Sequence, residues 1–138
     1  METVYPDDLR HAVGYDLASR AVADTQSSSQ GLVTKKLWYD GLDRLVSEDY
    51  GSGARENASY VWDGSVSDKG RLSQVVRGTG VTASYGYDAV GRRTSRAVTY
   101  QGLSLGQGWS YDLAGSPVQW TLPGGAHGSA GYDGFHLH

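Results

Sequence analysis

An aromatic residue followed by aspartate recurs along the chain at nearly constant spacing. The aspartates of successive copies are separated by 24, 23, 25, 24 and 21 residues within a chain of 138. A motif repeated at such an interval indicates an architectural unit rather than a single site. The copies are Tyr15-Asp16, Tyr39-Asp40, Trp62-Asp63, Tyr87-Asp88, Tyr111-Asp112 and Tyr132-Asp133.

Each copy reads as a strand that runs into a tight turn. The residue three positions before the aspartate is apolar or aromatic, so it shares one strand face with the aromatic of the pair. Residues 88–91 and 112–115 then read Asp-x-x-Gly. We expect the aspartate to accept hydrogen bonds from turn amides, and Gly91 and Gly115 to adopt positive φ in a bulged hairpin turn. Asp43 and Ser19 take the glycine position in other copies, and Asp43 tolerates that conformation better.

A second strand returns from each turn. It begins with arginine at Arg20, Arg44, Arg71 and Arg92, and with Ser116 in the fifth copy. Residues 63–70 insert extra positions in the third copy, and segments rich in Gly, Ser and Gln at 24–31, 50–57, 77–80 and 101–108 are typical of loops. The pattern predicts an all-β antiparallel meander of hairpins with about ten to twelve short strands. Residues 1–138 would form a single domain of about five and a half repeats, and residues 134–138 a mobile tail.

Composition agrees with strands and excludes several kinds of chemistry. There are 20 glycines and 10 tyrosines against one phenylalanine and one methionine, which disfavours long helices. The 12 basic and 15 acidic residues are interspersed, so no basic stripe predicts nucleic-acid binding. The absence of cysteine excludes disulfides, thiolate zinc sites and a cysteine nucleophile. The sequence has no window apolar enough for membrane insertion and no signal-peptide pattern at its start.

The clearest copy, YGYDAVGRRTS at residues 85–95, resembles the signature of the RHS/YD-repeat family. That signature is an aromatic residue, a small or polar residue, Tyr-Asp, two variable positions and Gly-Arg. WYDGLDRLVS at 38–47 and KGRLSQV at 69–75 fit most of it, while YPDD at 5–8 and LPGG at 122–125 resemble the turns between repeats. The resemblance covers residues 5–135, nearly the whole chain. The family includes bacterial RHS elements, C components of insecticidal toxin complexes and the related teneurins.

The resemblance implies a curved or spiralling sheet that forms part of a β-shell. In bacterial members such a shell encloses a C-terminal toxin that is released after self-cleavage. The Asp-Pro-x-Gly signature of the self-cleaving core is missing from this sequence, so we expect a non-enzymatic structural module. Expected partners are further YD repeats or a second copy at open sheet edges, and possible cargo is a toxin; neither nucleic acid nor membrane insertion is expected. The resemblance also implies a secreted or cell-surface location.

The repeated residues have a structural interpretation and a functional one. A surface of tyrosines and aspartates would suit sugar stacking, but the fixed register favours cross-strand aromatic contacts and turn caps. The arginines could form a basic groove, although a ladder with aspartates of neighbouring turns is favoured. The residues expected to build the repeat are Tyr15, Asp16, Tyr39, Asp40, Trp62, Asp63, Tyr87, Asp88, Gly91, Arg92, Tyr111, Asp112, Gly115, Tyr132 and Asp133.

Chemistry beyond the repeat has little support in the sequence. His136 and His138 could hold a metal only if a third ligand approached, while His11 and His127 have no nucleophile at a meaningful spacing. We therefore expect no catalytic, cofactor or metal residues. The alternative function is a carbohydrate- or protein-binding module with Trp38 as its anchor, because Trp38 occupies an outward position that is small in most copies.

Overall fold

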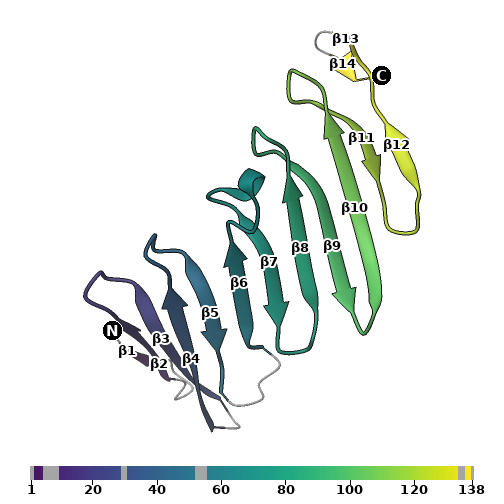
Figure 1. Cartoon of the computed structure of the whole chain (residues 1–138). Coiled ribbons are helices and arrows are strands. Elements are labelled where there is room, and N and C mark those ends of the chain that lie inside the picture. The colour runs from purple at the N-terminus through teal and green to yellow at the C-terminus, as the bar shows by residue number, and fades with distance from the viewer. Residues whose placement is uncertain (1, 5–9, 29–30, 52–55, 134–135, 138) are drawn as a thin grey trace. The chain divides into compact units, whose positions relative to one another are not determined.

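The computed structural model describes residues 2–4, 10–28, 31–51, 56–133 and 136–137. Twelve strands are hydrogen-bonded in the order of the sequence, and two further strands form a small separate sheet (Figure 1). Neighbouring strands run antiparallel in every pairing whose register is defined. The predicted all-β antiparallel meander is confirmed.

The chain divides into two compact units. The first comprises Met1–Tyr60 with Val76–Thr79, and the second comprises Val61–Val75 with Gly80–His138. The first holds β1 (Glu2–Val4), β2 (Arg10–Tyr15), β3 (Ala21–Ser28), β4 (Gly31–Tyr39), β5 (Leu45–Asp49) and most of β6 (Ala58–Trp62). The second holds the 3-10 helix η1 (Val66–Asp68), most of β7 (Leu72–Arg77), β8 (Thr82–Tyr87), β9 (Arg93–Tyr100), β10 (Leu103–Tyr111), β11 (Pro117–Thr121), β12 (His127–Ser129), β13 (Tyr132–Asp133) and β14 (His136–Leu137).

The domain boundaries expected from the sequence stay predictions. The described part of the expected tail, His136–Leu137, is the short strand β14, which pairs with β13. Residues 134, 135 and 138 lie outside the described residues.

Four hairpins share one irregularity beside the turn. Gly86 pairs with Ser95, whereas the next residue, Tyr87, pairs with Arg93, so Thr94 is an extra residue in β9. The hairpins β2-β3, β4-β5 and β10-β11 shift register at the same place. A β-bulge of this kind bends the strand and increases its twist locally. The extra residues are Val22, Val46, Thr94 and Val118, each six positions after the aspartate and each β-branched.

Two segments expected to be loops are largely strand. Within 24–31, β3 extends to Ser28 and β4 starts at Gly31; within 101–108, β10 starts at Leu103. The connection between β9 and β10 is the two-residue turn of Gln101 and Gly102, with φ of 49° and 82°. The expectation was wrong because glycine and serine, although typical of loops, also fit a strand that is paired in a ladder with its neighbour.

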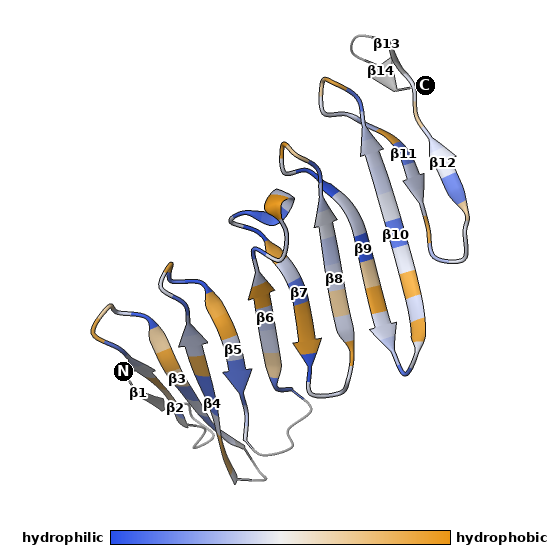
Figure 2. Cartoon of the chain, in the orientation of Figure 1, coloured by the Kyte–Doolittle hydropathy of each residue, from blue (hydrophilic) through white to orange (hydrophobic). Residues whose placement is uncertain are grey.

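The sheet has little enclosed core. Among the described residues only Ala58, Val75 and Asp68 are buried, and no side chain is less than 2% exposed. Hydrophobic residues lie at the turn tips and in patches along single strands (Figure 2). Stability must therefore come mainly from the backbone ladder and from contacts between neighbouring repeats, as in other repeat architectures. No helix in the described part of the chain is long and apolar enough to cross a membrane.

Candidate functional site

The aspartates of the first five pairs cap their own turns. Oδ1 of Asp88 accepts hydrogen bonds from the backbone N–H groups of Val90 (3.1 Å) and Arg92 (2.8 Å), and Oδ2 accepts one from Arg92 Nε (2.6 Å). The Asp88 N–H in turn donates to the carbonyl of Arg92 at 2.9 Å. Asp16 and Asp40 make the same contacts with residues two and four positions later. One carboxylate thus satisfies the donors of a turn that would otherwise face water.

Positive φ recurs at the fourth position of the turns. Gly91 and Gly115 have φ of 87° and 91°, and Ser19 and Asp43 have φ of 62° and 61°. Serine and aspartate here accept a backbone conformation that glycine adopts without a steric cost.

The third copy closes a longer turn. Asp63 N–H donates to the carbonyl of Arg71 at 3.1 Å, and Asp63 Oδ1 accepts a bond from Gly70 N–H at 2.6 Å. The inserted residues form η1, whose buried Asp68 accepts a hydrogen bond from Ser73 Oγ. The insertion lengthens the turn while its closing hydrogen bond persists.

The environment of the capping carboxylates lowers their pKa values. Backbone and side-chain hydrogen bonds from Arg20 lower the pKa of Asp16, and those from Arg44 lower the pKa of Asp40 despite some burial. For Asp88, burial alone would raise the pKa, but hydrogen bonds and charge attraction from Arg92 outweigh it and lower the pKa. These carboxylates are therefore held in the charged form that the turn requires.

Tyrosine hydroxyl groups link successive repeats. In the first unit, Tyr39 Oη donates to the carbonyl oxygen of Ala21 at 2.8 Å. In the second unit, Tyr87 Oη donates to Leu72 O at 2.9 Å, and Tyr111 Oη donates to Arg93 O at 2.8 Å. Every acceptor directly follows the arginine of the preceding repeat. The tyrosine of the motif thus anchors its repeat to the previous return strand.

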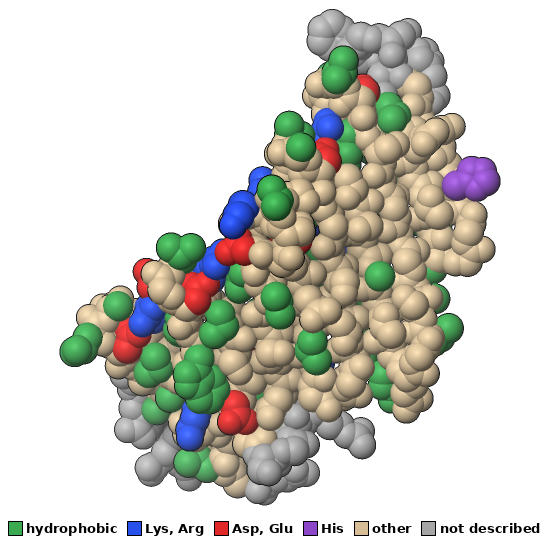
Figure 3. Space-filling view, in the orientation of Figure 1, with side chains coloured by type: hydrophobic (Ala, Val, Ile, Leu, Met, Phe, Trp, Pro, Cys, Tyr) green, Lys and Arg blue, Asp and Glu red, His purple; other side chains and the backbone are tan. Residues whose placement is uncertain are grey.

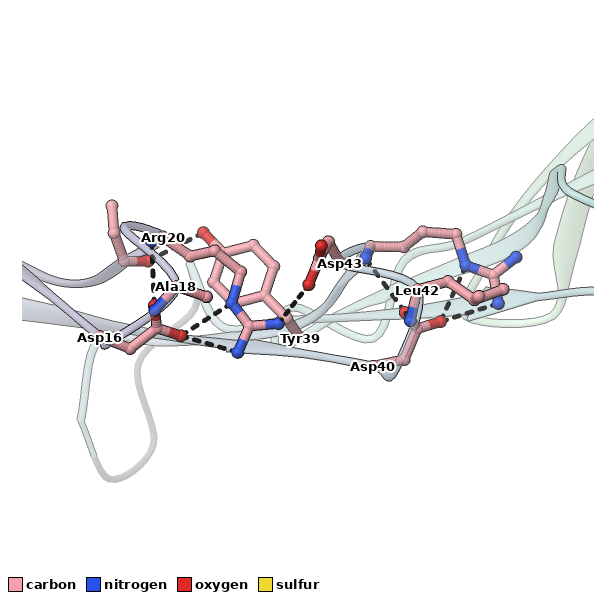
Figure 4. Close-up of polar contacts among 9 residues, drawn as sticks. Asp16, Ala18, Arg20, Tyr39, Asp40, Leu42 and Asp43 are labelled. Carbon is pink, nitrogen blue, oxygen red and sulfur yellow. Dashed lines mark hydrogen bonds and ion pairs between the residues drawn. The ribbon is translucent and has the colours of Figure 1, made fainter.

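The arginines reinforce the same link. The Arg20 guanidinium lies 5.2 Å from the Tyr39 ring centroid, while Nη1 donates to Asp43 Oδ1 at 2.6 Å (Figure 4). Arg92 stacks on Tyr111 at 4.9 Å and donates to the carbonyl of Asp112. We call this set of contacts the repeat interlock: a turn arginine bound to its own aspartate, stacked on the next tyrosine and bonded to the next turn.

The expected arginine ladder is only partly present. Arg20, Arg44 and Arg92 form ion pairs with the aspartate of their own turn, and Arg20 alone reaches a carboxylate of the next turn among the described contacts. Arg71 instead donates to the backbone carbonyl of Gly91 at 3.0 Å and lies over the Tyr87 ring. Acidic and basic side chains consequently lie side by side at the turns (Figure 3). Each of these arginines follows its own aspartate by four residues, and this spacing brings the two side chains together within one turn. Contacts with a carboxylate of another turn are therefore less frequent.

The remaining expected repeat residues lie in or beside the strands, and their role in the repeat stays a prediction. Tyr15 ends β2 and is 58% exposed, and Trp62 ends β6. Asp112 accepts a bond from the N–H of Ser116 at 2.8 Å, without an arginine at that position. Tyr132 and Asp133 form β13, and their side chains lie outside the described set.

Trp38 lies at a shallow groove in the first unit. Its side chain is 44% exposed, and its neighbours along the ladder are Ser47 in β5 and then Ser59 in β6. The groove has a volume of about 710 Å³ and is also lined by Asp49 and Asn57. Their side-chain oxygens already accept backbone hydrogen bonds from Gly51 and Tyr50. Trp38 thus offers an open aromatic surface, whereas the polar groups beside it are engaged in shaping the loop.

The described histidines take part in local contacts. His11 Nε2 lies 2.8 Å from Asp24 Oδ1, and Lys35 Nζ lies 3.8 Å from Asp24 Oδ2. His127 Nδ1 is 3.4 Å from the Gly125 carbonyl. His138 and the side chain of His136 lie outside the description. Within the described residues, no group of three or more His, Cys, Asp or Glu side chains could hold a metal ion.

The fold is similar to part of a solved toxin complex. A chain in the crystal structure of TcdB2-TccC3-Cdc42 superposes with a TM-score of 0.71 at 14% sequence identity, covering 96% of this chain and 7% of that one. This likeness confirms the resemblance to RHS/YD repeats at the level of the fold. No protein-family model and no curated protein sequence matches the chain. The chain spans a small fraction of its structural neighbour.

Proposed function

We propose that this chain is a wall section: a non-enzymatic YD-repeat module that extends a sheet around a toxin or presents a surface for assembly. The observation that carries the proposal is the repeat interlock, which is complete at Arg20-Tyr39 and Arg92-Tyr111. At Arg71-Tyr87 the stacking and the bond to the next turn are present. Within each unit it joins one repeat to the next through side chains at the turns. The likeness to a chain of the TcdB2-TccC3-Cdc42 complex supports the same role. A bacterial, secreted or cell-surface setting belongs to this proposal.

A wall section extends by pairing at its sheet edges. β12 is the last strand in the hydrogen-bonded order, and its described partner is β11. Ala130 N–H donates to Val118 O across that pair at 2.9 Å. Because hydrogen bonds alternate along an antiparallel strand, the N–H of Ser129 points toward the open side. An unpaired edge of this kind accepts another strand.

Analytical ultracentrifugation over a range of concentrations tests the wall section. We expect reversible association that Ser129→Pro weakens, because proline removes the outward N–H group. Ser129→Lys should weaken it as well, by placing a charge at the edge. Ser110→Lys is the matched control, since Ser110 and Ser129 both flank Gln119 on one face and Ser110 lies in an internal strand. A monomer at all concentrations, or equal association in all three variants, would contradict edge pairing.

A binding module around Trp38 is the second candidate. It is favoured by the exposed indole, which lies over a ladder of serines and leaves its ring open to a sugar or a partner side chain. Tryptophan fluorescence during titration with a glycan library, compared between the wild type and Trp38→Ala, tests this function. A glycan whose binding is lost in Trp38→Ala would support it, and unchanged fluorescence with every sugar would count against it.

A further inference from the structure

One face of the second unit carries two arginines without compensating acids. Arg96 in β9 lies directly between Tyr85 in β8 and Gln107 in β10, so the three side chains share a face. Arg93 belongs to the same face, because its guanidinium lies 5.6 Å from the Tyr85 ring centroid. Both arginines are exposed. We call Tyr85, Arg93, Arg96, Gln107 and Trp109 the arginine-aromatic face.

Neither guanidinium has a carboxylate within ion-pair distance among the described residues. The acidic residues of this unit with described side chains lie in turns, where they cap N–H groups or bond hydroxyls: Asp63, Asp68, Asp88 and Asp112. The first unit differs, since Lys35 and His11 both face Asp24 there. The charge on the arginine-aromatic face is therefore available to a ligand.

The face also includes a small depression and has an apolar border. Arg93, Trp109 and Tyr111 line a depression of about 230 Å³. A row of apolar residues crosses the same three strands and consists of Ala83, Val98 and Leu105. It lies two residues along the strands from the row of Tyr85, Arg96 and Gln107, and Leu105 is 49% exposed. The two rows lie about 7 Å apart, which is the spacing of alternate side chains in an extended chain.

The chemistry of the face selects an acceptor-rich partner. The guanidiniums, the Trp109 N–H and the Gln107 amide supply many donors, whereas acceptors are limited to the Gln107 carbonyl and the tyrosine hydroxyl. Sugar rings present hydroxyl groups that need acceptors as well as donors, so this face suits them poorly. Two cations are also few for a nucleic acid, whose binding depends on neutralising several phosphates. Carboxylates, in contrast, can accept two parallel hydrogen bonds from one guanidinium group.

We infer that the arginine-aromatic face binds an extended acidic peptide whose sheet-facing side chains, at every second position, are alternately apolar and carboxylate. Each carboxylate pairs with Arg93 or Arg96, and the apolar side chain lies on the row of Ala83, Val98 and Leu105. In a wall section the natural source of such a peptide is an enclosed or docked protein. This inference rests on the wall role for its biological setting only, since peptide binding needs no pairing at the sheet edge.

Fluorescence anisotropy with a short dye-labelled peptide, in which serine alternates with leucine and glutamate, tests the inference. We expect Arg93→Gln and Arg96→Gln each to raise the Kd about three- to tenfold, as loss of an exposed charge-assisted hydrogen bond does. The Kd of Arg96→Lys should lie between those of the wild type and Arg96→Gln. Lysine keeps the positive charge but cannot bind a carboxylate through two parallel N–H groups as the guanidinium does. Lys69→Gln, which makes the same charge change at an exposed position outside the face, should leave the Kd unchanged.

Three results would overturn the inference. The first is equal binding of the peptide with glutamine in place of glutamate. The second is an equal loss of affinity in Lys69→Gln and Arg96→Gln, which would indicate nonspecific charge attraction. The third is tighter, arginine-dependent binding of an oligouronate or a single-stranded oligonucleotide. Because every assay uses the Ser129→Pro variant alongside the wild type, a failure of peptide binding is distinguished from a failure of edge association.

Discussion

The guanidinium of Arg92 lies 4.9 Å from the ring centroid of Tyr111, although 19 positions separate the two residues in the sequence. The same arginine is bound to Asp88 of its own turn and to the Asp112 carbonyl of the next one. Arg92 thus closes its own turn and also positions the following repeat. This dual role explains how a sheet with almost no enclosed core can hold a fixed register.

The tyrosine hydroxyl groups should contribute measurably to stability. Tyr87→Phe removes the hydrogen bond to Leu72 O while it keeps the ring under Arg71. We expect the free energy of unfolding in urea to fall by about 1 kcal/mol. Tyr100→Phe is the control, because the Tyr100 side chain is 46% exposed and its hydroxyl has no hydrogen bond among the described residues. Equal effects of the two substitutions would show that the hydroxyl of Tyr87 does not link the repeats.

The two turn glycines should differ in their sensitivity to alanine. Both have positive φ, so either substitution carries the left-handed cost of about 1–2 kcal/mol. A Cβ at Gly91 would in addition collide with the Arg71 guanidinium, whereas a Cβ at Gly115 lies 4.0 Å from Arg92 Nη1. Gly91→Ala must therefore displace Arg71 and should destabilise the protein more than Gly115→Ala. Equal urea midpoints for the two variants would contradict the placement of Arg71.

Ser19 offers a substitution that should stabilise the chain. Its φ of 62° is unfavourable for serine, and glycine removes that cost. After the extra chain entropy of glycine is subtracted, we expect Ser19→Gly to raise the free energy of unfolding by about 0.5 kcal/mol. Ala18→Gly in the same turn should lower it, because Ala18 has no positive φ to relieve. A stabilising effect of Ala18→Gly, or none of Ser19→Gly, would contradict this explanation.

Acid should weaken the turns. The folded-state pKa values of Asp16, Asp40 and Asp88 lie below the ordinary aspartate value of 3.8. A carboxyl with a depressed folded pKa stabilises the fold above its unfolded pKa, and this contribution disappears as pH falls through the folded value. We expect the urea midpoint to be constant near neutrality and to decline below about pH 4.

A variant with asparagine at Asp16, Asp40 and Asp88 provides the control for the acid experiment. It should be less stable near neutrality and should show a shallower decline in acid, since the titrating groups are gone. An unchanged decline in this variant would assign acid sensitivity to other carboxyls.

The sequence predicted the parts of the repeat that local chemistry determines. The turn composition at 88–91 and 112–115 pointed to the caps and to positive φ, and the structure places Asp88, Gly91 and Gly115 accordingly. The meander followed from alternation and spacing. The full lengths of β3 and β10 do not follow from the sequence, because glycine, serine and glutamine are typical of loops and strand pairing decides their conformation here.

The links between repeats were harder to foresee. Alternation shows which strand face Tyr39 occupies, but it does not show that its hydroxyl reaches Ala21 O of the preceding repeat. The bulge had a signal that could have been found, the β-branched residue six positions after the aspartate at Val22, Val46, Thr94 and Val118. The uncompensated pair Arg93 and Arg96 requires knowledge of what lies opposite on neighbouring strands.

The most direct test of the repeat interlock is a double-mutant cycle at Arg92 and Tyr111. The free energy of unfolding in urea would be measured for wild type, Arg92→Gln, Tyr111→Leu and the double variant, so that contacts with third residues cancel. We expect a coupling energy of about 0.5–1 kcal/mol between the two side chains, as for a stacked cation and aromatic ring. Strictly additive effects of the two substitutions would contradict the claim that these residues join neighbouring repeats.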